Sequence, residues 1–176
     1  QGKPLVREDN TIIYGEGVTL IGDAVPPVDG MTLEYVWFDA EGNQLTSFST
    51  KTHAMTNMLP TQTGVYRLRV TAYSASLTSL TSVAYGEVAL TVGKRPINLS
   101  WTLPDNTVYS GTDKALSCVF DTDDLHTGDA APSAGDYELN YTSVRNAGSY
   151  TLTATLLGNF AELYYIPASD NNHRLS

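Results

Sequence analysis

The chain has 176 residues and a formal net charge of −9, from 10 basic and 19 acidic residues. Because phosphate recognition needs clustered Lys and Arg, which this sequence lacks, the balance argues against nucleic acid as a partner. No apolar run approaches the roughly 20 residues that a membrane-spanning helix needs, so we expect no membrane insertion. A single cysteine, Cys118, excludes an intramolecular disulfide, and its alternation with Leu116 and Phe120 predicts a small buried side chain.

The first half of the chain is a series of short strands separated by turn residues. Strands are predicted at 11–14, 18–21, 33–38 and 87–92. The third of these places Leu33, Tyr35 and Trp37 on one face, and a hairpin turn follows at 39–43. A tryptophan on the third strand before such a turn is typical of an immunoglobulin-like domain. The low-complexity segment 73–82 is expected to be an exposed loop or extended strand ends.

Two stretches, 63–72 and 147–156, repeat one pattern: a turn glycine, a tyrosine two residues later, and then alternating apolar and polar residues. Period-two alternation predicts half-buried strands. A glycine turn with a tyrosine at the start of a strand is the layout of a tyrosine corner in an immunoglobulin-like sandwich. Four tyrosines are expected in the core: Tyr35, Tyr66, Tyr141 and Tyr150.

Two corner motifs predict two domains, and the segment 93–96, Gly-Lys-Arg-Pro, is the expected boundary. The predicted fold class is therefore all-β, with two tandem immunoglobulin-like β-sandwiches at residues 1–93 and 94–176 joined by a short linker. Because a proline-bearing linker this short leaves little freedom, we expect a stiff, roughly end-to-end rod.

The second half begins with a strand at 97–104, whose apolar residues share one face. Residues 108–116 read as a strand, a glycine turn and the start of another strand, and an acidic loop follows at 121–132. Further strands are predicted at 137–142 and 163–166. No stretch sustains a 3.6-residue period, so helices are expected to be minor.

The second half resembles a known family through four segments: 101–104 (Trp-Thr-Leu-Pro), 106–114 (Asn-Thr-Val-Tyr-Ser-Gly-Thr-Asp-Lys), 146–154 (Asn-Ala-Gly-Ser-Tyr-Thr-Leu-Thr-Ala) and 158–160 (Gly-Asn-Phe). They resemble bacterial immunoglobulin-like repeats of the MBG type, which occur in tandem on bacterial surface and secreted proteins. The resemblance covers nearly all of residues 95–176, and the family normally ends with one more strand, which we expect this chain to lack. The first half looks like a generic bacterial immunoglobulin-like domain, through Trp37 and its corner motif.

The acidic loop holds the best candidate for a metal site. Clustered carboxylates on a loop can supply oxygen ligands for Ca²⁺, and Asp121, Asp123 and Asp124 form such a cluster. The twelve-position calcium-loop pattern is absent, however, so a solvated acidic loop is the favoured interpretation. The three histidines are far apart in sequence and have no cysteine partners, which argues against zinc.

Three tyrosines are candidate ligand-binding residues, because Tyr73, Tyr85 and Tyr164 fall off the inward pattern or near loops. An exposed aromatic ring offers flat apolar area with a polar tip, which can stack on a sugar. The favoured alternative is that these tyrosines cover a sandwich edge or the interdomain joint.

The resemblance implies a spacer or adhesion module at the cell surface or outside the cell, with no catalysis, no cofactor and no binding residues to transfer. We expect a piece of a longer protein that acts as a stalk, with the other domains of the parent chain as partners. The alternative is a module that binds a host or environmental glycan or protein, and a third hypothesis is an accessory domain of a surface glycoside hydrolase. No spacing in the sequence marks a catalytic pair or triad.

Overall fold

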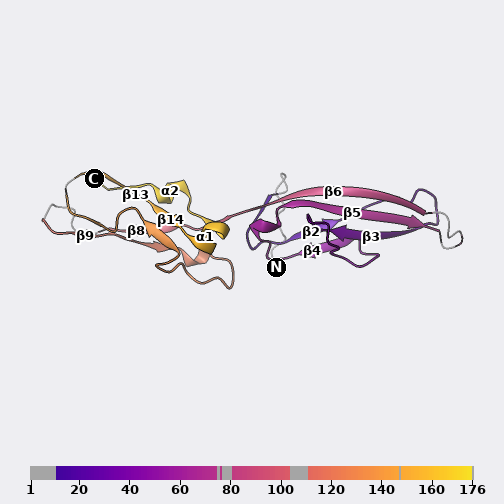
Figure 1. The fold of residues 1–176 in the computed structure, drawn as a ribbon, viewed down its shortest axis with the longest axis horizontal. Helices are drawn as coiled ribbons and strands as arrows, with labels where there is room; N and C mark the ends of the chain where they lie inside the picture. The colour runs from indigo at the N-terminus through magenta and orange to yellow at the C-terminus, as the bar shows by residue number, and fades with distance from the viewer. Residues whose placement is uncertain (1–10, 75, 77–80, 104–110, 147, 176) are drawn as a thin grey trace. The chain divides into compact units, whose positions relative to one another are not determined.

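The structure is a computed structural model, and it describes residues 11–74, 76, 81–103, 111–146 and 148–175. Strands dominate, and the predicted all-β, immunoglobulin-like fold class is confirmed. The chain divides into two compact units, Gln1–Gly93 and Lys94–Ser176 (Figure 1). Among the described residues, no helix combines the length and the apolar character needed to cross a membrane.

Unit 1 contains a four-stranded sheet in the order β1-β6-β5-β3 and a two-stranded sheet of β2 and β4. The bounds are β1 Thr11–Ile13, β2 Val18–Ile21, β3 Thr32–Phe38, β4 Thr52–Met55, β5 Gly64–Tyr73 and β6 Thr81–Gly93, with a 3₁₀ turn η1 at Pro60–Gln62. The long strands β5 and β6 run side by side in Figure 1 and are antiparallel. At the other edge of β6, β1 pairs in parallel, with Thr11 opposite Thr91.

The core of unit 1 follows the alternation that the sequence predicts. On β5, the residues Tyr66, Leu68, Val70 and Ala72 are all buried, whereas Arg67 between them is exposed. Residues from both sheets and from the segment after β4 close the rest of the cluster: Ile12, Val18, Leu20, Tyr35, Trp37, Met58, Leu90 and Val92. Period-two patterning therefore sets which face of each strand is apolar, and the second sheet covers that face.

Two parts of unit 1 differ from the sequence prediction. Strand β6 has 13 residues and extends well before the predicted start at position 87. Strand β4 was not predicted, because its Thr-His-Ala-Met sequence lacks the apolar alternation of a buried strand. The structure makes β4 a strand through its antiparallel pairing with β2. Residues 75 and 77–80 of the low-complexity segment lie outside the described part of the chain.

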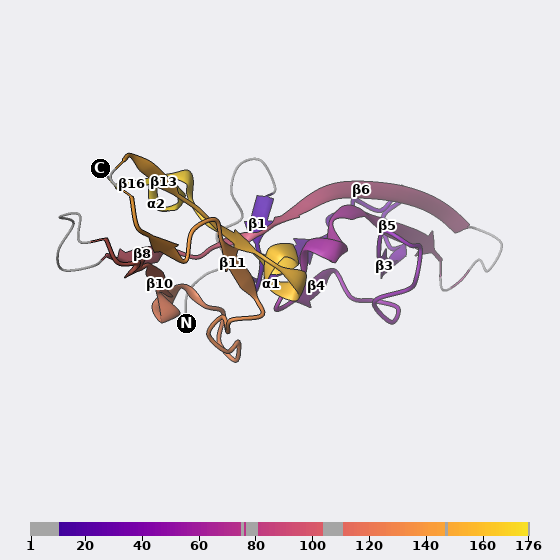
Figure 2. The same ribbon diagram turned by 60° about the vertical axis from the view of Figure 1, so that its left-hand side comes forward.

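Unit 2 is built from short strand pairs: β10 with β8, β11 with β14, β12 with β9, β13 with β16, and β15 with β7. The strands are β7 Arg95–Pro96, β8 Leu99–Thr102, β9 Lys114–Ala115, β10 Ser117–Phe120, β11 Tyr137–Leu139, β12 Ser143–Val144, β13 Tyr150–Leu152, β14 Ala154–Leu156, β15 Tyr164–Tyr165 and β16 His173–Leu175. A 3₁₀ turn η2 spans Thr122–Asp124, and short helices span Gly158–Leu163 (α1) and Ala168–Asn171 (α2). Figure 2 shows β8 beside β10 and β13 beside β16.

The second corner stretch is divided into β13 and β14 by side chains that replace strand pairing. Asn140 accepts a hydrogen bond from the Thr153 backbone N–H at 2.9 Å and donates one to the Thr151 carbonyl at 2.8 Å. Asn171 accepts from the Ala154 N–H at 2.7 Å. The apolar alternation nevertheless holds, since Leu152 is 0% and Ala154 1% exposed. Amide side chains thus satisfy backbone groups that a neighbouring strand would otherwise bond.

Both tyrosine corners are present. The Tyr66 hydroxyl donates to the Gln62 carbonyl at 2.9 Å, and the Tyr150 hydroxyl donates to the Asn146 carbonyl at 2.9 Å. Each bond spans four residues back along the chain, which is the geometry that defines this corner. Cys118 is also buried, as predicted, and burial raises the pKa of its thiol.

Parts of unit 2 differ from the sequence prediction. Tyr141 is not a core residue: it is 40% exposed and contacts Tyr150 edge-on, with 5.4 Å between ring centroids. The strand expected at 163–166 is limited to β15, because Leu163 is the last residue of helix α1. A helix of six residues is too short to show the helical period in the sequence.

Candidate functional site

The most exposed aromatic group of unit 1 lies on what we call the outer face. This is the side of the β3–β5–β6 sheet whose residues alternate with the buried core residues. Directly opposite residues of paired strands point to the same side of a sheet, so the register defines the members of this face. They include Glu34, Val36, Phe38, Arg67, Arg69, Thr71, Tyr73, Val83, Tyr85 and Glu87.

The structure brings two of the three predicted tyrosines onto this one face. Tyr85 is 72% exposed and stands directly opposite Arg69. Tyr73 is partly buried and lies at the end of β5, opposite Thr81. Val83, which is 50% exposed, belongs to the same face. The outer face therefore presents aromatic and apolar area to solvent, with Tyr85 as its most accessible ring.

Arg69 is the residue of this face that sequence reasoning missed. Its guanidinium carbon lies 5.5 Å from the centroid of the Phe38 ring, which is within the range of a cation–π contact. Its Nε is buried and has no hydrogen-bond partner among the described residues. Arg67, two residues before it, differs because its Nε is 2.9 Å from a carboxylate oxygen of Glu87. In the sequence the two arginines occupy equivalent polar positions, so no local signal distinguishes them.

Tyr164 does not belong to an exposed site, which corrects the sequence expectation. It is 2% exposed, and its hydroxyl accepts a hydrogen bond from the His126 N–H at 2.9 Å and donates one to the Asp129 carboxylate. Its ring stacks on Phe160, with 5.3 Å between centroids. The residue looked exposed because it follows a turn, but the long loop before β11 and helix α1 cover it.

Beside Tyr164 lies an open cavity of about 270 Å³. Its polar lining includes Asp129, Asp136 and Asn159, and its apolar lining includes Phe160. Hydrogen bonds from the Ser133 hydroxyl and backbone N–H lower the pKa of Asp136, so this carboxyl group is ionised at neutral pH. Both carboxylates already accept hydrogen bonds from neighbouring residues, which gives them a structural role in this loop.

The three candidate calcium ligands of the acidic loop are engaged in local hydrogen bonds, in line with the favoured interpretation of a solvated loop. Asp121 caps η2 by accepting from the Asp123 N–H at 3.0 Å, and Asp124 accepts from the Asn98 N–H at 2.8 Å. Within the described ranges, no three His, Cys, Asp or Glu side chains are grouped so that they could hold a metal ion. The carboxylates are therefore used locally to satisfy backbone donors at a turn, as acidic N-caps commonly are.

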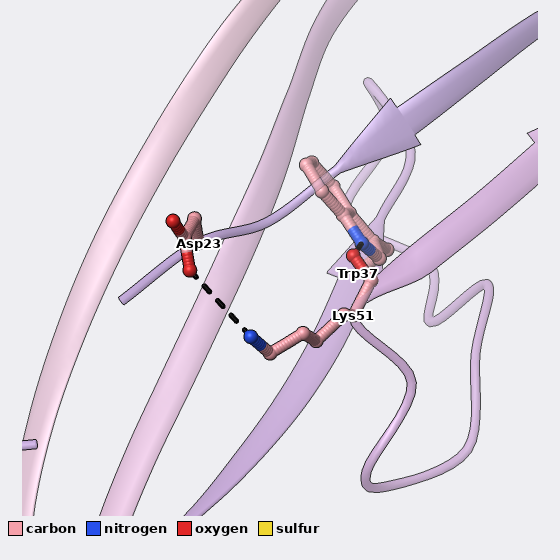
Figure 3. Close-up of polar contacts among 3 residues, drawn as sticks. All are labelled: Asp23, Trp37 and Lys51. Atoms are coloured by element: carbon pink, nitrogen blue, oxygen red, sulfur yellow. Dashed lines mark hydrogen bonds and ion pairs between the residues drawn. The ribbon is translucent and has the colours of Figure 1, made fainter. Parts of the chain in front are cut away.

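A second groove, of about 310 Å³, lies between β2 and β6 in unit 1. Core residues such as Leu20, Trp37 and Leu68 form its floor, and Asp23 is at its rim. Figure 3 shows the Asp23 carboxylate paired with the Lys51 ammonium at 3.5 Å. The Lys51 carbonyl accepts from the Trp37 indole N–H at 3.3 Å, so the backbone of Lys51 holds the tryptophan while its side chain makes an exposed ion pair with Asp23. This groove is mainly apolar and offers little for a polar ligand.

Comparison with known proteins does not assign the chain to a family. No family model and no curated protein matches it. Among solved structures, it is similar to the one described as the crystal structure of murine CEACAM1b, with 13% identity and a TM-score of 0.35. That alignment covers 78% of this chain and 73% of the other. A likeness of this degree carries no argument about function, and the resemblance of residues 95–176 to MBG-type repeats stays a prediction.

Proposed function

We propose that this chain is a non-catalytic spacer module of a bacterial cell-surface or secreted protein. The observation that supports this function best is the junction between the two units. Strand β6 ends at Gly93 and strand β7 begins at Arg95, so Lys94 alone separates the strands. A connection of one residue, with a proline two positions later at Pro96, leaves few backbone torsions in which two domains can move independently.

Each unit also carries the elements that an independent spacer domain needs. Each has its own buried cluster and its own tyrosine corner. Strands β7 and β15 pair near the start of unit 2, and Lys94 donates a hydrogen bond to the Ala161 carbonyl at 2.5 Å. The residues immediately after the boundary are therefore held within unit 2, which shortens the free connection further.

The test is a distance distribution between spin labels placed on exposed strand positions of the two units, Ser82→Cys and Thr155→Cys. The native thiol is removed by Cys118→Ala. A stiff spacer gives one narrow distribution, and inserting four Gly-Ser residues after Gly93 broadens it. A distribution equally broad with and without the insertion would contradict the proposal, because the native junction would then be as free as a flexible linker.

A second candidate function is recognition of a glycan or a protein. The specific observation that favours it is the gathering of Tyr73, Val83 and Tyr85 on the outer face, with Tyr85 at 72% exposure. A binding screen of the whole chain against immobilised glycans and matrix proteins distinguishes the two functions. Saturable binding that Tyr85→Ala removes would support recognition, whereas its absence would leave the spacer as the remaining function.

A further inference from the structure

We propose that the outer face is a binding site for a carboxylate-bearing sugar, in which Arg69 pairs with the carboxylate and Tyr85 stacks on the sugar ring. This inference rests on the recognition function and is independent of the spacer function. It specifies the chemistry of the ligand, whereas the exposure of aromatic residues alone does not indicate any particular ligand.

Arg69 supplies the charge for this site. The ion pairs among the described residues join Arg67 to Glu87 and Lys51 to Asp23, so the Arg69 guanidinium forms no ion pair with a carboxylate in the part of the chain that the structure describes. A partly buried cation without a counter-ion is unfavourable, because burial removes water without replacing it by a partner. A ligand carboxylate placed here removes that cost and forms charge-assisted hydrogen bonds.

The surroundings of Arg69 restrict how such a ligand approaches. The Nε atom is buried, so the terminal nitrogens are the donors that an incoming carboxylate can reach. The Phe38 ring, 5.5 Å from the guanidinium carbon, supports the guanidinium. Val36, opposite Arg69 on β3, is 1% exposed and adds a rigid apolar base. A planar guanidinium held in this way is suited to bidentate contact with a carboxylate.

Tyr85 supplies the apolar half of the site. It is the direct cross-strand partner of Arg69, and such partners have Cβ atoms roughly 5 Å apart. One exposed aromatic residue directly across the ladder from one arginine matches the footprint of one sugar ring with one carboxylate. A peptide would need anchor pockets or an unpaired strand edge, but neither is formed by the cross-strand pair of Arg69 and Tyr85 in the middle of the β5–β6 ladder. These observations favour a sugar over an acidic peptide.

The experiment measures binding of the whole chain to matched pairs of immobilised glycans. One arm compares uronate oligosaccharides with the same molecules after carboxyl reduction, and a second arm compares sialylated glycans with their desialylated forms. A poly-glutamate peptide is the acidic, non-sugar probe. Affinities for the best pair are then measured by titration calorimetry.

Four variants test the assignment. Arg69→Gln is expected to weaken binding of the acidic member by about tenfold or more, and Arg69→Lys, which keeps the charge but loses the planar fork, by a smaller factor. Tyr85→Ala is expected to weaken binding of both members of a pair by roughly three- to tenfold, because it removes the stacking surface. Arg174→Gln is the matched charge control in unit 2 and is expected to leave affinity within about twofold, since it removes the same charge without changing the outer face. Urea unfolding curves show that each variant is folded.

The site would be supported if the chain prefers the acidic glycan of a pair, and if Arg69→Gln loses this preference while Arg174→Gln keeps it. The arm that shows binding, uronate or sialylated, then identifies the source of the carboxylate. Equal binding of acidic and neutral members would overturn it. So would a blank on both arms, or poly-glutamate binding with the same dependence on Arg69. None of these outcomes changes the distance distribution that tests the spacer, so the two proposals fail separately.

Discussion

Removal of the Tyr66 hydroxyl, by Tyr66→Phe, tests whether the tyrosine corner stabilises unit 1. The ring is 3% exposed, and its hydroxyl donates to the Gln62 carbonyl at 2.9 Å. The variant keeps the apolar ring in the core and deletes only the hydrogen bond. Tyr150→Phe makes the same change in unit 2, where the bond to the Asn146 carbonyl has the same length but lies in exposed surroundings.

The expected cost follows from burial. A hydrogen bond within a protein contributes about 1 kcal/mol net, with more when a buried partner is left unsatisfied. Because Gln62 is exposed, water can satisfy its carbonyl in the variant, so Tyr66→Phe should destabilise unit 1 by about 1 kcal/mol. Tyr150→Phe should cost about half of that, since water already competes for the bond. Tyr85→Phe, at a site 72% exposed, should cost almost nothing.

Urea unfolding followed by tryptophan fluorescence measures these costs, because Trp37 reports on unit 1 and Trp101 on unit 2. With a slope of about 1–2 kcal/mol/M for a unit of this size, Tyr66→Phe should lower the unit 1 midpoint by about 0.5–1 M at unchanged slope. Burial raises the pKa of Tyr66 above 10.0, so its neutral form stabilises unit 1 below pH 10.0 and this contribution is lost as the pH rises through the folded-state pKa. An unchanged midpoint in Tyr66→Phe, or a larger loss in Tyr150→Phe, would refute the reasoning.

Three further predictions concern single positions. A Cβ on Gly64 would lie 2.4 Å from the Cβ of Ala40, so Gly64→Ala should destabilise unit 1 by about 1–3 kcal/mol in urea unfolding, whereas Gly86→Ala, whose nearest contact is 4.0 Å away, should be neutral or slightly stabilising. Because burial raises the pKa of Cys118, its thiol should react with Ellman's reagent at neutral pH at least about tenfold more slowly in the folded chain than in urea, and equal rates would show that it is accessible. Hydrogen bonds in its turn lower the pKa of Asp39 from 3.8, so its contribution to stability is present above pH 3.8 and is lost as the pH falls through the folded-state pKa. Asp39→Asn should therefore reduce the acid sensitivity of the unfolding midpoint, and an unchanged pH profile would contradict this.

Much of the fold could be predicted from the sequence, because its strongest signals are local. The alternation around Tyr66 and Tyr150 sets which side chains face inward, and the glycine two residues earlier marks the start of each corner motif in the sequence. Where a strand forms only because a partner strand is available, the local residue pattern does not predict it. Residues 52–55 have no distinctive pattern and become β4 only because β2 offers a partner edge. Helix α1 is missed for the opposite reason, since one short turn of helix leaves too few residues to show a period.

The candidate site was only partly accessible to sequence reasoning. Tyr73 and Tyr85 could be selected because exposure correlates with position in the alternating pattern. Their placement on one face depends on the register between β5 and β6, which depends on contacts far apart in the chain. The burial of Tyr164 and the isolation of Arg69 from carboxylates are likewise tertiary properties. Neither changes the local pattern of residue types.

The parallel pairing of β1 with β6 determines how unit 1 would respond to tension. Thr11, Ile12 and Ile13 pair with the last residues of β6, and the Tyr14 N–H donates to the Gly93 carbonyl at 2.8 Å. If the chain is pulled before β1 and after β6, the two parallel strands are drawn past each other in shear. Their slanted, evenly spaced hydrogen bonds then share the load, whereas a hairpin pulled at its open end loses its bonds one by one. Resistance to extension is therefore concentrated in this short ladder, and rupture of the ladder would set the rate of forced unfolding of unit 1.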